Sequence, residues 1–155
     1  MCLTRQFYLT LSLFVLLSAV SCYGQTVEEK SNLDLTKIKN QDIHRAFENA
    51  KASNRLVLLV FDATWCPYCK QLNEETLQNA KVLETLTQYE KVNVDIDANP
   101  EDADLFQAKP ASLGGGGIPA IIILSADGKE LDRTVGFSQA KEFNAFLRKN
   151  LKKLK

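Results

Sequence analysis

The chain of 155 residues is 45% apolar and 25% charged, an ordinary composition for one folded domain with a core. Lysine plus arginine and aspartate plus glutamate both number 19, so no basic excess points to nucleic acid as a partner. With only four cysteines, the chain lacks the cysteine density of a small scaffold held by several disulfides.

The N-terminus carries an apolar run, residues 9–20 (LTLSLFVLLSAV), preceded by the single charge of Arg5. A membrane span needs about 20 apolar residues, so this shorter run is more typical of a secretory signal peptide. Small residues just before Cys22 would permit cleavage there. We therefore predict a signal peptide at 1–21, with an uncleaved anchor as the alternative. These residues also loosely resemble a bacterial lipoprotein signal, in which Cys22 would carry the lipid, and lipidation stays open because Ala19 replaces the usual leucine.

Residues 22–40 are polar without periodicity, which predicts a tether or an irregular N-terminal arm. A helix is predicted next, because apolar residues recur at helical spacing at positions 43, 46, 47 and 50. His44, the only histidine, lies beside that stripe and is predicted to be solvated. No second histidine is present to help it bind a metal.

Two strands are predicted in the middle of the chain. Residues 56–61 (LVLLVF) form a continuous apolar run, typical of a strand covered on both faces. Residues 91–97 (KVNVDID) alternate between apolar and polar. Between these strands, Pro67 suits the first turn of a helix that continues in two pieces. A short helix is predicted at 101–109 after the second strand.

The patch at 110–117 (PASLGGGG) predicts a mobile loop, because four consecutive glycines do not form a regular element. A strand at 118–125 follows, then a turn and a partner strand at 131–136. The chain ends in a helix with one apolar face. This order of elements predicts an α/β fold with a central mixed sheet and helices on both faces.

Cys66 and Cys69 stand where the first strand gives way to a helix. Unpaired N–H groups and the helix dipole favour a thiolate on Cys66 at that helix start. Cys69 comes round to the same helical face, so the two sulfurs can form and release a disulfide. A zinc site would need two further ligands, and a structural disulfide here would close too small a loop to restrain the unfolded chain. The pair is therefore predicted to be a redox centre.

Five segments carry a family resemblance: TWCPYCK at 64–70, KVNVDIDANP at 91–100, GIPAIIIL at 117–124, DGKEL at 127–131 and VGF at 135–137. Together they resemble the thioredoxin superfamily over about residues 43–151. The chain is most similar to extracytoplasmic thioredoxin-like proteins, including the C-terminal domain of thiol:disulfide interchange transmembrane reductases. The resemblance implies a thioredoxin fold over 41–155 and protein-disulfide oxidoreductase activity.

The resemblance also implies roles for individual residues. Cys66 would be the nucleophile and Cys69 the resolving thiol. The Ile118–Pro119 bond would be cis, Pro119 would lie against the cysteines and keep metals off them, and Ile118 would pair with substrate backbone. The substrate-binding residues it implies are Trp65, Pro67, Tyr68, Ile118 and Pro119. For Tyr68 a plain surface aromatic is the alternative.

Two departures from the family pattern bear on the chemistry. Val60 replaces the buried acid that thioredoxins carry six residues before the first cysteine. Asp62, on the same strand face, would partly substitute in proton transfer, or would simply cap the next helix. Lys91 matches the family's strand lysine, and its part in proton transfer is open without the usual acid. The glycine-rich stretch, where relatives have a short turn, would widen the substrate groove or be inert slack.

These observations predict an exported thiol–disulfide oxidoreductase, periplasmic or secreted, that reduces or exchanges protein disulfides. Its only redox group would be the Cys66–Cys69 disulfide, with no cofactor and no metal. Its partners would be protein thiols or disulfides and a thiol electron donor or acceptor, and it would be a monomer touching a membrane only through a lipid on Cys22. A non-catalytic, chaperone-like binding module is the competing hypothesis, separable by an insulin-reduction assay.

Overall fold

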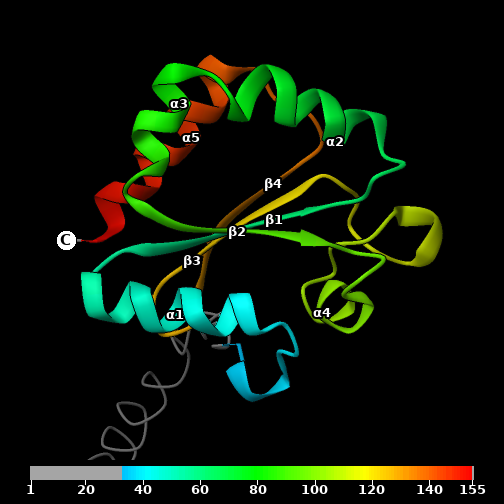
Figure 1. Cartoon of the computed structure of the whole chain (residues 1–155), viewed down its shortest axis with the longest axis horizontal. Helices are drawn as coiled ribbons and strands as arrows, with labels where there is room; N and C mark the ends of the chain where they lie inside the picture. Colours follow the sequence, from blue (N-terminus) through cyan, green and yellow to red (C-terminus); the bar gives the residue numbers. More distant parts are fainter. Residues whose placement is uncertain (1–32, 155) are drawn as a thin grey trace, which may run out of the picture.

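A four-stranded mixed sheet forms the centre of the molecule, in a computed structural model that describes residues 33–154. The predicted signal peptide and Cys22 lie outside the described residues. The strand order is β2–β1–β3–β4 (Figure 1). The central strand β1 (Leu56–Asp62) runs parallel to β2 (Tyr89–Asp95) and antiparallel to β3 (Ala120–Leu124). Strand β4 (Glu130–Val135) pairs antiparallel with β3, which confirms the predicted mixed sheet.

Helices cover both faces of this sheet (Figure 1). One face is covered by α1 (Gln41–Ser53) and α4 (Pro100–Leu105). The other is covered by α2 (Pro67–Gln71), its π-helical continuation η2 (Leu72–Leu77), α3 (Ala80–Leu86) and α5 (Ala140–Leu151). Short 3₁₀ turns are η1 (Leu35–Lys37), η3 (Ala111–Leu113) and η4 (Lys152–Leu154). Over residues 33–154, no helix has the length and apolar character to cross a membrane.

Strand β1 contributes to a separate core on each face of the sheet. Val57, Leu59 and Phe61 pack with the α1 and α4 side, and the intervening residues 56, 58 and 60 pack with the α3 and α5 side. Every one of these six side chains is at most 1% exposed, as predicted for a strand covered on both faces. Burying both faces fixes the register of β1, because a slip by one residue would exchange its two sets of side chains. The residues that follow it are therefore anchored firmly.

Three elements end earlier or start later than the sequence predicts. Strand β2 stops at Asp95, because its Oδ1 accepts the backbone N–H groups of Asp97 (2.8 Å) and Ala98 (3.2 Å) and turns the chain. Helix α4 stops at Leu105, and Gln107 then has a φ of 53° that no right-handed helix accepts. Strand β3 starts only at residue 120, after Pro119.

The described part of the predicted N-terminal arm, residues 33–40, is irregular and packed against the domain. The buried carboxylate of Asp102 accepts the backbone N–H groups of Lys39 and Asn40, each at 2.9 Å. His44 was predicted to be solvated, and it is only partly exposed. It is half-buried, with its Nε2 atom 3.0 Å from the carbonyl oxygen of Ile38, because the arm folds back over α1.

Candidate active site

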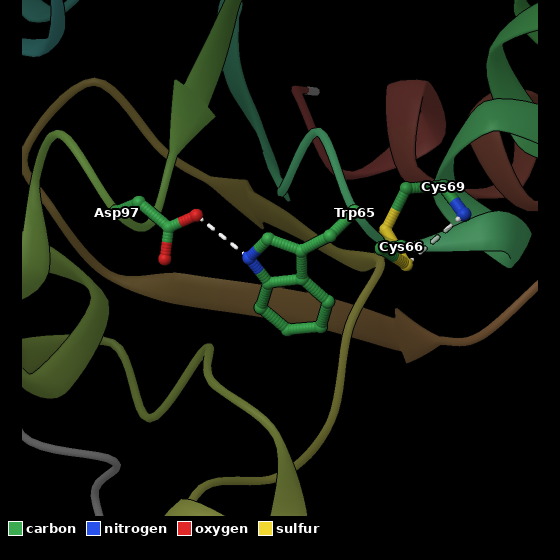
Figure 2. The surroundings of a disulfide bond; sticks show 4 residues. All are labelled: Trp65, Cys66, Cys69 and Asp97. Atoms are coloured by element: carbon green, nitrogen blue, oxygen red, sulfur yellow. Dashed lines mark hydrogen bonds between the residues drawn. A yellow bond between two sulfur atoms is a disulfide. The ribbon is translucent and has the colours of Figure 1, made fainter.

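The two cysteines form a disulfide at the first turn of α2, with their Cα atoms 5.2 Å apart (Figure 2). Cys66 is the N-cap residue of that helix, and its Sγ atom accepts the backbone N–H of Cys69 at 3.2 Å. Pro67 occupies the first helical position, as predicted, where its missing N–H leaves no partner unsatisfied. The strand-to-helix junction therefore holds both sulfurs at a helix start.

The disulfide lies at a sharp boundary between the core and the surface. Cys66 and Cys69 are each 5% exposed, whereas Trp65 is 56% and Tyr68 61% exposed. Burial therefore does not distinguish the two cysteines. The hydrogen bond from the Cys69 N–H to Cys66 does distinguish them, because the same N–H would stabilise a thiolate on Cys66 once the disulfide is reduced.

Trp65 is held by an interaction that connects two loops. Its Nε1–H donates to Oδ2 of Asp97 at 2.7 Å (Figure 2). Asp97 was not among the predicted site residues. A usable signal was its place just after β2, because the carboxyl ends of parallel neighbouring strands meet at one edge of the sheet. This bond fixes the indole beside the disulfide.

Ile118 and Pro119 lie at the same end of the sheet as the cysteines. The peptide bond between them is cis. Ala120 pairs with Phe61 in the register of β3 and β1, so Pro119 lies beside the point where the cysteine loop leaves β1. The carbonyl oxygen of Pro119 accepts the backbone N–H of Gly136 at 2.8 Å, which ties this turn to the end of β4.

Asp62, the last residue of β1, has a partly buried carboxyl group. Desolvation, and secondarily the charge of Asp95, raise the pKa of Asp62, while Lys91 opposes that shift. Desolvation lowers the pKa of Lys91, and Asp62 opposes it in turn. The alternative that Asp62 caps the next helix is wrong, because Cys66 is the cap. Val60, which stands in the family's acid position, is buried in the apolar core.

The described part of the chain was searched for side chains that could bind a metal ion together. Over residues 33–154, no group of three or more His, Cys, Asp or Glu side chains gathers in a way that could hold a metal ion. The chemistry that this geometry supports directly is disulfide exchange at Cys66 and Cys69.

Comparison with known sequences gives a consistent picture. The profile of the thioredoxin-like domain family matches residues 43–151. The thiol:disulfide interchange protein DsbD of Ralstonia nicotianae is 35% identical over 111 residues, which is 71% of this chain and 18% of that protein. DsbD of Vibrio cholerae is 29% identical over 123 residues, 77% of this chain and 20% of that protein. The chain thus spans about a fifth of the length of these relatives.

Solved structures share the fold. The C-terminal domain of Neisseria meningitidis DsbD in its oxidised form superposes with a TM-score of 0.57 at 24% identity, covering 73% of this chain and 97% of that domain. A disulphide isomerase from Xylella fastidiosa superposes with a TM-score of 0.57 at 27% identity, covering 72% of this chain and 89% of that one. The arrangement of sheet and helices is therefore that of a thioredoxin fold.

Proposed function

The chain belongs to the thioredoxin-like domain family, and we propose that it works as a protein-disulfide oxidoreductase outside the cytoplasm, reducing or exchanging disulfides of polypeptide substrates. The observation that carries this proposal is the Cys66–Cys69 disulfide at the start of α2, flanked by two exposed aromatic side chains. The similarity to thiol:disulfide interchange proteins supports the same chemistry.

The reaction begins with both cysteines reduced. The Cys66 thiolate attacks one sulfur of a substrate disulfide, so a bond forms between Cys66 and that sulfur, and the other substrate sulfur leaves as a thiolate that takes up a proton. Cys69, deprotonated, then attacks the Cys66 sulfur, and the second substrate sulfur leaves and is protonated. The substrate has gained two electrons and two protons, and the protein holds its Cys66–Cys69 disulfide. A dithiol donor reduces that disulfide by the same two steps in reverse roles.

Cys66 is assigned the attacking role because of its place at the helix start. The N–H of Cys69 points at its sulfur, and the positive end of the helix dipole favours a negative charge there. The aromatic rings of Trp65 and Tyr68 provide apolar surface beside it, and Ile118 is proposed to pair with the substrate backbone next to Pro119.

Asp62 is proposed to take the proton that Cys69 loses before the second attack. A carboxyl group with a raised pKa accepts a proton more readily than an ordinary one. Lys91 would keep Asp62 able to ionise, because its positive charge opposes the upward shift. Asp62 would thus partly replace the acid that Val60 displaces.

Insulin reduction driven by a dithiol tests the activity. We expect the wild-type protein to accelerate insulin precipitation and the Cys66→Ser, Cys69→Ser double variant to be no faster than the dithiol alone. Leu83→Ala, an exposed change on α3, serves as a control that should match the wild type. A wild-type protein no better than the double variant would overturn the proposal and favour a non-catalytic binding module.

Export is proposed from the apolar run and the small residues before Cys22. Intact-mass analysis of protein from its native host is expected to show a chain that has lost residues 1–21. A mature chain that still begins at Met1 would contradict export by this route. An added diacylglyceryl mass on Cys22 would establish lipidation, and its absence would leave a freely exported protein.

A further inference from the structure

Exposed large apolar side chains are few in the described residues, and two of them flank the cysteines. They are Trp65, Tyr68, Leu83, Leu113 and Val135. Trp65 and Tyr68 flank the cysteines in the chain. Val135 lies against Gly117, where an added Cβ would come within 2.9 Å of its Cγ1, next to Ile118. Leu83 on α3 is the exception, so the other four mark a candidate recognition surface.

Leu113, the most exposed of the five at 62%, lines a cavity of about 410 Å³. The other apolar residues of its lining are Ile96, Pro100 and Ala103, from the β2–α4 connection and α4. The start of α2, α4 and the segment around Leu113 all lie at the same end of the sheet (Figure 1). Asp97 also lines the cavity, and it is the residue that holds Trp65 beside Cys66 (Figure 2). Asp97 therefore connects the cavity to the residue that flanks Cys66.

The charges in the lining are already paired. Asp97 accepts the indole N–H of Trp65 at 2.7 Å, and Asp104 forms an ion pair with Lys109. A charged ligand group would have to compete with these pairs, whereas an apolar side chain would cover the apolar lining without disturbing them. The occupant that this lining favours is thus an apolar side chain.

The glycine-rich segment is built to hold Leu113 in place. Gly116 N–H donates to the carbonyl oxygen of Gln107, and Gly117 N–H to that of Lys109, each at 2.8 Å. A Cβ on Gly115 would lie only 2.2 Å from the Lys109 carbonyl oxygen, so the segment can fold back this closely only with glycine there. Its irregular course carries Leu113 to the edge of the cavity.

We propose that Leu113 and this cavity bind an apolar side chain of the polypeptide substrate, on the segment that carries the cysteine attacked by Cys66. The proposal rests on the proposed function and names a specificity-determining residue for it. Binding would cover Leu113, which otherwise stays in water, and would place the substrate disulfide next to Trp65. The segment at 110–117 then acts as a recognition element of the enzyme.

Peptide disulfides that differ at one position test the proposal. One series carries a single leucine at each position around the cysteine in turn, and the matched series carries serine instead. At one position, the wild type is expected to favour the leucine peptide by about tenfold in kcat/KM. Leu113→Asp should abolish that preference through KM, with kcat and the rate on a small disulfide unchanged. Leu113→Met should retain it, and Leu83→Ala should behave as the wild type.

Two outcomes separate this inference from the proposed function. If the wild type turns over the peptides but Leu113→Asp treats the two series as the wild type does, the inference fails and the oxidoreductase function stands. If the wild type turns over neither series, the function fails, and binding of the leucine peptide is followed instead by the emission of Trp65, the only tryptophan. Equal affinity of the wild type and Leu113→Asp in that titration would overturn the inference.

Discussion

The residues proposed to transfer protons and the residues proposed to recognise substrate differ in charge and polarity. One group, called the inner group here, consists of Cys69 and the two residues proposed to assist its proton transfer, Asp62 and Lys91; desolvation raises the pKa of Asp62 and lowers that of Lys91. The other group, called the rim, consists of the exposed apolar residues proposed to recognise substrate: Trp65, Tyr68, Leu113 and Val135. Two adjacent residues belong to different groups: Cys69, in the inner group, is 5% exposed, and Tyr68, in the rim, is 61% exposed. This division predicts that the proposed proton transfer and substrate recognition can be altered separately by substitution.

The largest expected effect is the loss of disulfide-exchange turnover when a cysteine of the pair is replaced. Cys66→Ser should lower turnover at least about a thousandfold, because the attacking thiol is lost and the remaining thiol of the pair, Cys69, is buried within α2. Cys69→Ser should also stop turnover, but it should accumulate the mixed disulfide on Cys66, since the resolving thiol is missing. Mass spectrometry after incubation with a peptide disulfide measures both. Equal trapping by the two variants would contradict the assignment of Cys66 as the attacking cysteine.

The next largest effect is expected from a substitution in the inner group. Asp62→Asn should slow resolution of the mixed disulfide by roughly ten- to a hundredfold, because the group proposed to take the Cys69 proton is lost. The slowing should be the same for protein and small disulfides. Rapid-quench detection of the mixed disulfide measures it, with the exposed change Asp42→Asn as control. An unchanged resolution rate would remove Asp62 from the mechanism.

The same variant should be more stable than the wild type at neutral pH. Because its folded-state pKa is raised, Asp62 binds its proton more tightly in the native protein than in the unfolded chain, so stability is lost as pH rises through that pKa. The gain from Asp62→Asn should shrink as the pH falls toward about 4 and vanish below about pH 3, where the carboxyl is protonated in both states. Half-exposure limits the gain to less than about 1 kcal/mol. Thermal unfolding across pH measures it, and a gain that persists at low pH would point to another cause.

A smaller effect should appear in the rim. Asp97→Ala removes the acceptor that holds the Trp65 indole, so the ring should sample more orientations. We expect KM for protein disulfides to rise about threefold to tenfold, as for loss of one ordinary hydrogen bond at an exposed position, with the rate on small disulfides unchanged. Asp97→Asn keeps an acceptor and should recover much of the loss. A fall in kcat on small disulfides would place Asp97 with the inner group instead.

The smallest effect is expected at Tyr68. Tyr68→Ala should raise KM for protein disulfides only about twofold to threefold, because the ring contributes apolar area in an already exposed position. Tyr68→Phe should match the wild type, since the ring and not the hydroxyl is used. Steady-state kinetics with insulin measures both. A wild-type KM in Tyr68→Ala would make Tyr68 a plain surface aromatic.

The local pattern of apolar residues and prolines was enough to predict most of the strands and helices. The continuous apolar run of β1 locates the strand, and the proline after Cys66 locates the start of α2. Both signals come from residues that are adjacent in the sequence. These two features also place both cysteines, because the site is formed within a few residues of one junction. The order of elements then leaves few ways to arrange a mixed sheet.

Contacts between distant segments escaped prediction, because nothing in the local sequence encodes them. The bond from Trp65 to Asp97 joins two loops that meet only after β1 and β2 have paired. The contact of His44 with the Ile38 carbonyl depends on the arm folding back, which Asp102 secures from another helix. The end of β2 escaped prediction for a different reason, because it is set by a local contact: an Asp95 side-chain oxygen accepts the N–H of Asp97 and competes with the strand ladder, which the alternating pattern of 91–97 does not reveal.

The central position of β1 has a consequence for folding and hydrogen exchange. β2 is the next strand after β1, separated from it by α2, η2 and α3, but β3 must return across about half of the domain before it can pair on the other side. Closing so long a loop is slow, so the sheet should be completed late in folding. Once it is complete, the amides of β1 are bonded between two neighbours and should exchange with solvent only through global unfolding. The cysteine loop is thus attached to β1, which with β3 is one of the two strands of the described sheet that we expect to exchange most slowly.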